Sequence, residues 1–212
     1  SIFHLMTHAF FKALLFLAAG SVIIAMHHEQ DMRKMGGLRK YLPVTWLTSL
    51  VGTLSLIGFP GFSGFFSKDA LIEAVGHAGR AGSTYAWWCL LIGVFVTALY
   101  SFRMYFLVFH GQERMDAETR AHLPESPWVI TVPLVLLAIP SVVIGWLTIQ
   151  PVVFGDYFGS SILVREANDV LGELAGEFHG PWAYVVHAFS GPVTYLALAG
   201  SFTALSVYLR NP

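Results

Sequence analysis

The sequence is poor in charge and nearly free of cysteine. Only 12% of its 212 residues are charged, about half the share of roughly 25% that is usual in soluble proteins. The single cysteine, Cys89, excludes an internal disulfide and an iron–sulfur cluster, and its apolar neighbours predict a small buried side chain. The formal net charge is −1 and no basic tract occurs, so we expect no nucleic-acid partner. Motifs for nucleotides, flavin or haem are absent too.

Long apolar runs are abundant. Hydrophobic residues make up 55% of the chain, and the continuous runs are about twenty residues long, the length of a helix that crosses a bilayer. Strands of a membrane β-barrel would instead alternate in segments of about ten residues. We therefore predict an all-α, multi-spanning transmembrane helix bundle. Five spans are predicted, at residues 2–26, 45–75, 85–109, 128–149 and 182–209.

The second predicted span is a discontinuous helix. It is too long for one straight span and too short for two complete ones. Helix-breaking residues interrupt it near 58–64, namely Gly58, Pro60, Gly61 and Gly64. Proline removes a backbone donor and glycine permits non-helical geometry. The first half then ends in unpaired carbonyl groups, which stabilise cations in transporters built from discontinuous helices.

Ionisable residues follow this break. A charged side chain in the membrane is costly unless it faces a partner or water, so we interpret Lys68 and Asp69 as parts of an ion pathway. The alternative for Lys68 is a structural ion pair with an acid such as Asp69. Glu73 follows Asp69 at i+4, and either acid could be a counter-charge or only an interfacial acid near the outer exit. For Glu73 and His77 the alternative is a solvated helix end.

Three ionisable residues also share one face of the first predicted span. His4, His8 and Lys12 are spaced i, i+4 and i+8, with about 6 Å of helical rise between neighbours. Histidine titrates near neutral pH, so such a row suits proton transfer through bridging waters. The alternatives are histidines that only form hydrogen bonds at the outer interface and a lysine that reaches towards an interface. A metal site is disfavoured because the histidines lack an intervening glutamate and a carboxylate ligand.

Other features are less specific. Arg33, Lys34, Arg39 and Lys40 lie in the first loop and place it on the cytoplasmic side. Ala167, Leu171, Leu174 and Phe178 predict either a short amphipathic surface helix or an ordinary solvated loop within 150–180. We interpret His187, in the fifth span, as a core histidine rather than as a relay. Both ends of the chain resemble cut ends, so we expect an internal piece of a longer polypeptide.

Four stretches in this order and spacing resemble one known family. They are HLMTHAFFKALLFLAAGSVI, KMGGLRK, GFPGFSGFFSKD and SFRMYFLVFHG. They are similar to the NuoL-type, antiporter-like membrane subunit (chain L or chain 5) of respiratory complex I, and the resemblance is specific from Ser1 to about Gly111. It implies an inverted-repeat fold of which residues 1–212 form a partial transmembrane domain. It also implies that Lys12, with His8 and His4, passes protons laterally and that Lys68, beside Asp69, lies towards the exit side.

The resemblance further implies proton translocation within NADH:quinone oxidoreductase in a bacterial inner membrane. NADH, FMN, iron–sulfur clusters and quinone are expected in partner subunits, and no cofactor or metal is expected in this chain. The expected partners are the lipid bilayer and other membrane-arm subunits, especially an adjacent antiporter-like subunit. Two alternatives remain open. One is a subunit of a multisubunit sodium/proton antiporter or a membrane-bound hydrogenase complex, and the other is a scaffold whose buried charges only hold helices together.

Overall fold

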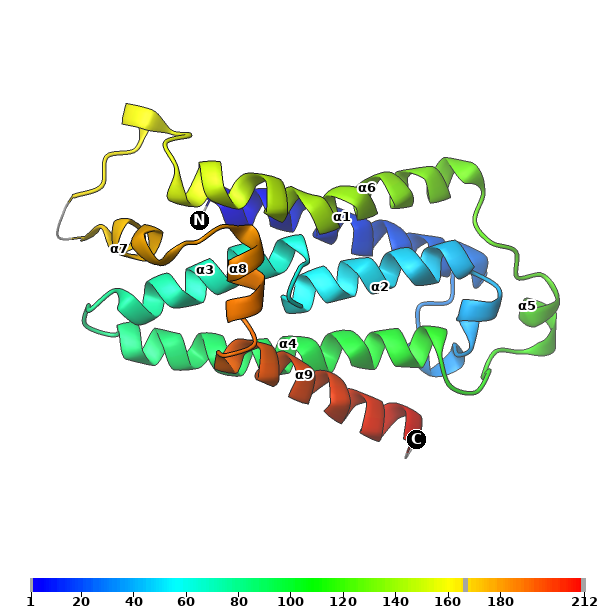
Figure 1. Ribbon diagram of the computed structural model, residues 1–212. Helices are drawn as coiled ribbons and strands as arrows, with labels where there is room; N and C mark the ends of the chain where they lie inside the picture. The colour runs from blue at the N-terminus through cyan, green and yellow to red at the C-terminus, as the bar shows by residue number, and fades with distance from the viewer. Residues whose placement is uncertain (1, 166–167, 211–212) are drawn as a thin grey trace.

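The protein is an elongated bundle of helices that run side by side (Figure 1). The computed structural model describes residues 2–165 and 168–210, and this part of the chain contains no β-strand. The long helices are α1 (Ile2–Ala25), α2 (Pro43–Ile57), α3 (Ser63–His77), α4 (Ser83–Phe109), α6 (Trp128–Ile149) and α9 (Pro192–Leu205). The short helices are α5 (Ala117–Ala121), α7 (Val170–Glu177) and α8 (Pro181–His187).

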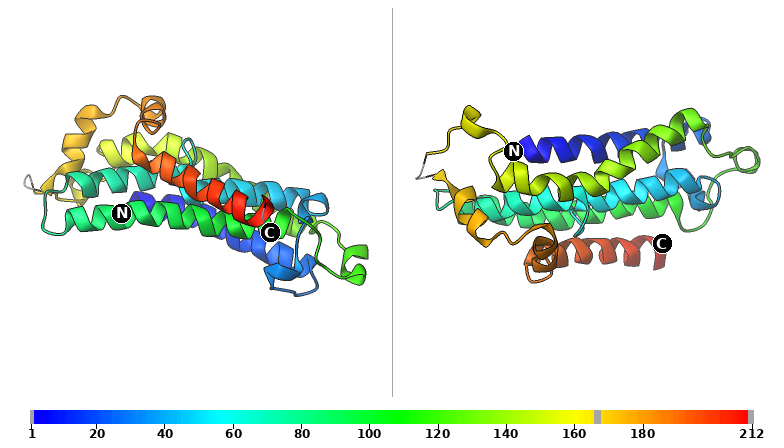
Figure 2. Two further views of the ribbon diagram at one scale, coloured as in Figure 1. Left: turned by 90° about the horizontal axis from the view of Figure 1, so that it is seen from below. Right: turned by 45° about the horizontal axis from the view of Figure 1, so that its top comes forward.

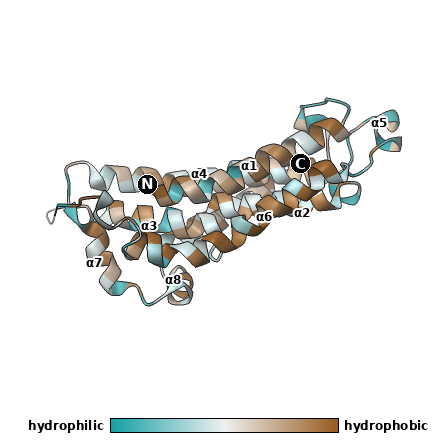
Figure 3. Ribbon diagram, turned by 90° about the horizontal axis from the view of Figure 1, so that it is seen from above, coloured by the Kyte–Doolittle hydropathy of each residue, from teal (hydrophilic) through white to brown (hydrophobic). Residues whose placement is uncertain are grey.

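The chain is a multi-pass membrane protein. Four stretches of the described residues are helical, long and apolar enough to cross a membrane: Ile2–Ala25, Ser83–Phe109, Trp128–Phe154 and Pro192–Arg210. Helices α2 and α3 have 15 residues each and follow one another along the bundle. Hydrophobic residues predominate along the bundle, whereas hydrophilic residues gather at its two ends (Figure 3). This distribution fits a bundle whose long axis crosses the bilayer.

Packing within the bundle places the interrupted pair α2 and α3 at its centre. Helix α1 packs against α2 and α6, and α3 packs against α6, α4 and α1. Helix α9 lies along α4 in the most extensive helix pair of the fold (Figure 2). Phe65 and Phe66 of α3 are completely buried, together with Ile149 of α6. Both halves of the broken helix are therefore enclosed by neighbouring helices.

The fifth predicted helix differs from the structure. Instead of one helix over 182–209, α8 runs across the direction of the long helices, and α9 begins after a turn (Figure 1). Each helix begins with a glycine–proline pair, so Pro192 supplies a helix start rather than a continuation. The turn between them includes a bond from the Ser190 N–H to the carbonyl of His187. The apolar composition of this stretch concealed the interruption.

Two smaller expectations have different outcomes. Cys89 is exposed rather than buried, because membrane helices are apolar on their outer faces as well as on their packed faces. The amphipathic surface helix corresponds to α7, in which Leu174 is buried. Ala167, which belonged to that expected pattern, lies outside the described residues.

Polar contacts order the end of the bundle that carries α5. Arg33 donates to Asp31 at 2.7 Å and lowers the pKa of that carboxyl to about 2. The Nε1 of Trp46 donates to Nε2 of His110, just beyond α4, at 3.2 Å. Burial lowers the pKa of His110 below its ordinary value, and the charge of Arg39 lowers it further. His110 therefore accepts this hydrogen bond as a neutral imidazole.

Candidate functional site

The first half of the broken helix ends at a glycine. Gly58 has φ 77°, a left-handed conformation in which glycine is not strained. Its N–H donates to the carbonyl of Ser55 at 3.1 Å, and the N–H of Phe59 donates to that of Leu54 at 2.9 Å. Gly61 repeats the left-handed geometry with φ 91°. Of the predicted breaker residues, Gly58, Pro60 and Gly61 lie in the turn between α2 and α3, and Gly64 lies in the first turn of α3.

The second half begins in direct contact with the first. The hydroxyl of Ser55 accepts a hydrogen bond from the N–H of Gly64 at 3.0 Å and lies 3.2 Å from the hydroxyl of Ser63. A Cβ atom on Gly64 would overlap the carbonyl oxygen of Ser55. The two half-helices can approach this closely only because residue 64 is glycine, and Ser55 satisfies one of the N–H groups that a helix start leaves unpaired.

Helix α6 holds the turn from the side. The Nε1 of Trp146 donates to the carbonyl of Gly61 at 2.7 Å. At the neighbouring position, a Cβ on Gly145 would lie 2.5 Å from the ring of Phe66. The irregular backbone is thus covered by protein, as non-helical backbone in a membrane must be.

Lys68 lies across the break. Its Nζ donates to the carbonyl of Leu56 at 3.0 Å, and Leu56 belongs to the last turn of α2, where carbonyl groups lack helical partners. The lysine stem lies against Gly58, where an added Cβ would be 3.5 Å from Cδ of Lys68. The ammonium group therefore lies at the negative end of the α2 dipole. Lys68 forms none of the four ion pairs found within residues 2–165 and 168–210, so the alternative of a pair with Asp69 is not observed.

His4 joins the first helix to this region. Its Nδ1 is 2.9 Å from the hydroxyl of Ser67, which also lies 2.7 Å from the hydroxyl of Thr7. Ser67 and Thr7 are both buried, and Ser67 directly precedes Lys68. The structure thus places the outermost member of the predicted histidine row beside the broken helix.

The other two members of that row lie along α1. The rings of His8 and His4 are 5.7 Å apart, and His8 meets the ring of Phe11 edge-on. Lys12 is exposed, and its Nζ lies 4.8 Å from the ring centre of Phe16. Lys12 is therefore on a face of α1 that the rest of the described chain leaves uncovered, and no direct contact with Lys68 is found there.

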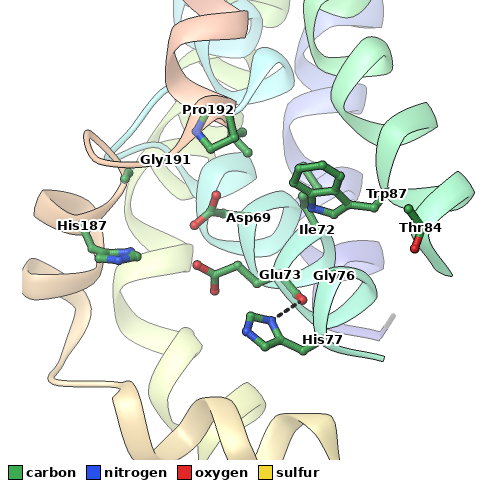
Figure 4. A pocket seen from close by; sticks show the side chains of 12 residues that line it. Asp69, Ile72, Glu73, Gly76, His77, Thr84, Trp87, His187, Gly191 and Pro192 are labelled. Atoms are coloured by element: carbon green, nitrogen blue, oxygen red, sulfur yellow. Dashed lines mark hydrogen bonds between the residues drawn. The ribbon is translucent and has the colours of Figure 1, made fainter. Parts of the chain in front are cut away.

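Asp69 and Glu73 line a separate cavity of about 480 Å³ between α3, α4 and the α8–α9 turn (Figure 4). Asp69 is only 7% exposed. The hydroxyl of Tyr184, on α8, donates to Oε2 of Glu73 at 3.2 Å. His77 and His187 line the same cavity. Although the cavity contains carboxylates and imidazoles, no group of three such side chains among the described residues has the geometry of a metal site.

Two alternatives from the sequence are corrected here. His187 is not a core histidine, because it is exposed and lines the cavity. Glu73 is not part of a freely solvated helix end, because it is partly buried and bonded to Tyr184. The reason for both differences is α8, whose transverse path was hidden by its apolar sequence.

Sequence reasoning missed four residues of the site: Ser55, Ser67, Trp146 and Tyr184. Ser55 bonds to a residue on the other side of the helix break, and the other three bond to residues that are far away in the sequence. Ser67 carried the best signal, since a polar residue directly before Lys68 in an apolar stretch calls for a hydrogen-bond partner.

Comparison with known proteins gives one consistent result. Residues 1–100 match the family described as "NADH:quinone oxidoreductase/Mrp antiporter, TM". The chain is 51% identical over 229 aligned residues to NADH-quinone oxidoreductase subunit L of Neisseria meningitidis serogroup B, covering 100% of this chain and 34% of the relative. It is 41% identical over 216 residues to NADH-ubiquinone oxidoreductase chain 5 of Marchantia polymorpha, covering 100% of this chain and 31% of that one. The chain thus spans about a third of the length of the curated relatives it matches.

Proposed function

Because the chain belongs to the NADH:quinone oxidoreductase/Mrp antiporter transmembrane family, as a NuoL-type subunit, we propose that it forms part of a proton-translocating path. The path would pass from Lys12 through His8 and His4 to Lys68, and then to Asp69. Proton transfer is the event in this chain, and redox chemistry belongs to other subunits.

The observation that carries this proposal is the bond from Lys68 to the carbonyl of Leu56. A backbone carbonyl stabilises the ammonium group by a dipole and not by a full opposite charge. The lysine can therefore lose its proton without leaving a buried carboxylate unpaired, which would be costly. A structural lysine would more naturally be paired with an acid.

The contact between His4 and Ser67 supports a route by which a proton could reach Lys68. The hydroxyl of Ser67 can both accept and donate a hydrogen bond, so it can relay a proton between an imidazole and the region of Lys68. From His4, the row continues along α1 to His8 and Lys12, with gaps that bridging waters close. The exposed position of Lys12 suits a group that receives its proton from outside the described bundle.

The assignment of partners follows from the relatives. We infer that the chain assembles with other membrane-arm subunits of NADH:quinone oxidoreductase, including an adjacent antiporter-like subunit, in a bacterial inner membrane. NADH, FMN, iron–sulfur clusters and quinone would be bound by those partners. The relatives' names, which are those of oxidoreductase subunits, support this assignment.

A second candidate is a cation/proton antiporter subunit, because the matching family also includes Mrp antiporters. The two functions are distinguished in membrane vesicles that contain the assembled complex. NADH-driven acidification should be unchanged when potassium replaces all sodium. A loss of transport without sodium would instead support the antiporter and contradict the proton path as proposed.

A further inference from the structure

Tyr184, on α8, reaches a carboxylate of the broken helix. Its ring is 9% exposed and contacts the rings of Phe65 and Phe66 on α3, at centroid distances of 5.6 and 6.3 Å. Its hydroxyl donates to Oε2 of Glu73 at 3.2 Å. A buried tyrosine hydroxyl needs such a partner, and the aromatic packing fixes where the hydroxyl can point.

The hydrogen bond from Tyr184 fixes the position of the Glu73 carboxylate in the cavity. Asp69 and Glu73 are one helical turn apart on α3, so they lie on the same face, and both line the cavity. His187 comes from the same short helix as Tyr184 and faces Glu73 across the cavity (Figure 4). The carboxylate of Glu73 thus shares one cavity with the buried Asp69 and the exposed His187.

We propose that Glu73 is the outer proton acceptor of the path and that Tyr184 is its positioning residue, which holds the carboxylate between Asp69 and His187. The proposal rests on the proposed function and extends it beyond Asp69. In the step, the carboxylate of Glu73 takes the proton released by Asp69 and passes it to the imidazole of His187. The imidazolium then loses that proton to water on the outer side, so that each group returns to its starting state.

The transverse course of α8 supports this role. Tyr184 and His187 are three residues apart on this helix and so lie on one face of it, which brings the hydroxyl of Tyr184 to Glu73 and His187 to the cavity. The turn that follows α8 is itself held by two hydrogen bonds: Thr194 donates to the carbonyl of Ala188 and Tyr195 to that of Phe189, both at 2.8 Å. The position of Tyr184 is set by its ring packing against Phe65 and Phe66, whereas these two bonds hold the turn that comes after it.

The test measures NADH-driven proton pumping per NADH oxidised in vesicles, with assembly of the complex checked in each preparation. Tyr184→Phe keeps the ring packing and removes only the hydroxyl. We expect pumping to fall roughly threefold to tenfold, the range that one hydrogen bond of ordinary net strength accounts for. Glu73→Gln should reduce pumping more, and the double variant should be no worse than Glu73→Gln alone.

Tyr195→Phe is the matched control, because it also removes a tyrosine hydroxyl from a hydrogen bond beside α8, but one that is made to a backbone carbonyl. It should pump normally. Equal losses in the two tyrosine variants, or additive losses in the double variant, would make Tyr184 merely structural and overturn the proposal. If the complex with Tyr184→Phe fails to assemble, the result for Glu73→Gln tests the proposal instead. Normal pumping by Glu73→Gln would overturn the proposal.

The outcome for Lys68→Ala separates this inference from the function on which it depends. If Lys68→Ala abolishes pumping while Glu73→Gln pumps normally, the proton path stands and its outer part does not include Glu73. If both variants pump normally, the proposed function itself fails.

Discussion

At the residue scale, the environment of each lysine matters more than its position in the sequence. Lys68 donates to a carbonyl that the helix break leaves without a partner. Lys12 lies on an exposed face of α1 near Phe16. The two lysines therefore occupy different parts of the proposed path, an internal one at the break and one at the surface of the described bundle.

Lys12→Ala should lower coupled turnover strongly. The substitution leaves a gap in the α1 row that is too long for one water molecule. We expect a loss of roughly a hundredfold, the lower end of what a positioned proton-transfer group contributes. Turnover and pumping of the assembled complex measure it.

His27→Ala provides the comparison for Lys12→Ala. His27 is exposed beyond the end of α1, so its loss should leave turnover close to normal. A large loss in His27→Ala, or normal pumping in Lys12→Ala, would show that the path is misplaced.

His110 gives a pH prediction for the end of the bundle that carries α5. Burial lowers its pKa, while the unfolded imidazole keeps its ordinary value of about 6.5. Between those two values the unfolded state binds more protons, so the contribution of His110 is complete above about pH 6.5 and is lost as the pH falls through the folded pKa. The N–H of Gly37, which donates to the carbonyl of His110 at 3.1 Å, should lose protection from hydrogen exchange as the pH falls below about 6.5.

This loss of protection is corrected for the intrinsic pH dependence of exchange. It should disappear in His110→Gln, which cannot be protonated, and persist in His122→Gln, a change at an exposed histidine in the next loop. If Gly37 loses the same protection at low pH in His110→Gln, protonation of His110 is not the cause.

At the element scale, the broken helix depends on two glycines that permit close contact. A Cβ on Gly64 would overlap the Ser55 carbonyl, and a Cβ on Gly145 would meet Phe66. These contacts explain why the irregular turn is held in one geometry, with Trp146 bonded to the carbonyl of Gly61. The same turn places the Leu56 carbonyl within reach of Lys68.

Gly64→Ala should therefore destabilise the assembled subunit by about 1–3 kcal/mol, the usual cost of overpacking a tight contact. Its midpoint of thermal unfolding in detergent should fall. Gly20→Ala and Gly93→Ala are matched controls, because both positions lie within helices and an added Cβ meets nothing within 4 Å. Equal stability of all three variants would mean that the half-helices separate freely at the break.

The sequence predicted the broken helix because its cause is local. Glycine and proline act on the backbone where they occur, so Gly58 to Gly64 could be interpreted without a fold. The course of α8 could not be predicted, since a continuous apolar stretch is compatible with one span or with a short transverse helix and a turn. The contact of Tyr184 with Glu73, which depends on that course, could not be foreseen either. Cys89 was expected to be buried because its neighbours are apolar, but apolar residues also cover the outer faces of membrane helices.

At the scale of the whole molecule, the two ends of the bundle differ. The end with α5 carries the basic loops that the positive-inside rule places in the cytoplasm, and the opposite end carries α7 (Figure 1). The cavity with Glu73 and His187 is lined by α3, α4 and the α8–α9 turn and not by these basic loops. Helix α3 runs from the break towards the end with α7 (Figure 1). A path from Lys68 through Asp69 and Glu73 therefore runs towards the outer side.

This orientation predicts a labelling pattern. In a Cys89→Ser background, Glu118→Cys in α5 should react with a membrane-impermeant maleimide only when the cytoplasmic face is accessible. Ser161→Cys, at the α7 end, should react only from the outer side. Both positions are exposed in the structure, so the reverse pattern would contradict the orientation of the path.

The central claim is that Lys68 is a working proton site. Its most direct test is NADH-driven pumping by vesicles that carry Lys68→Ala, with assembly measured in the same preparation and Lys34→Ala, a change at an exposed loop lysine, as control. We predict that pumping is lost in Lys68→Ala and retained in Lys34→Ala, with both complexes intact. Normal pumping by an assembled Lys68→Ala complex would contradict the claim and leave the broken helix as a packing feature of a membrane scaffold.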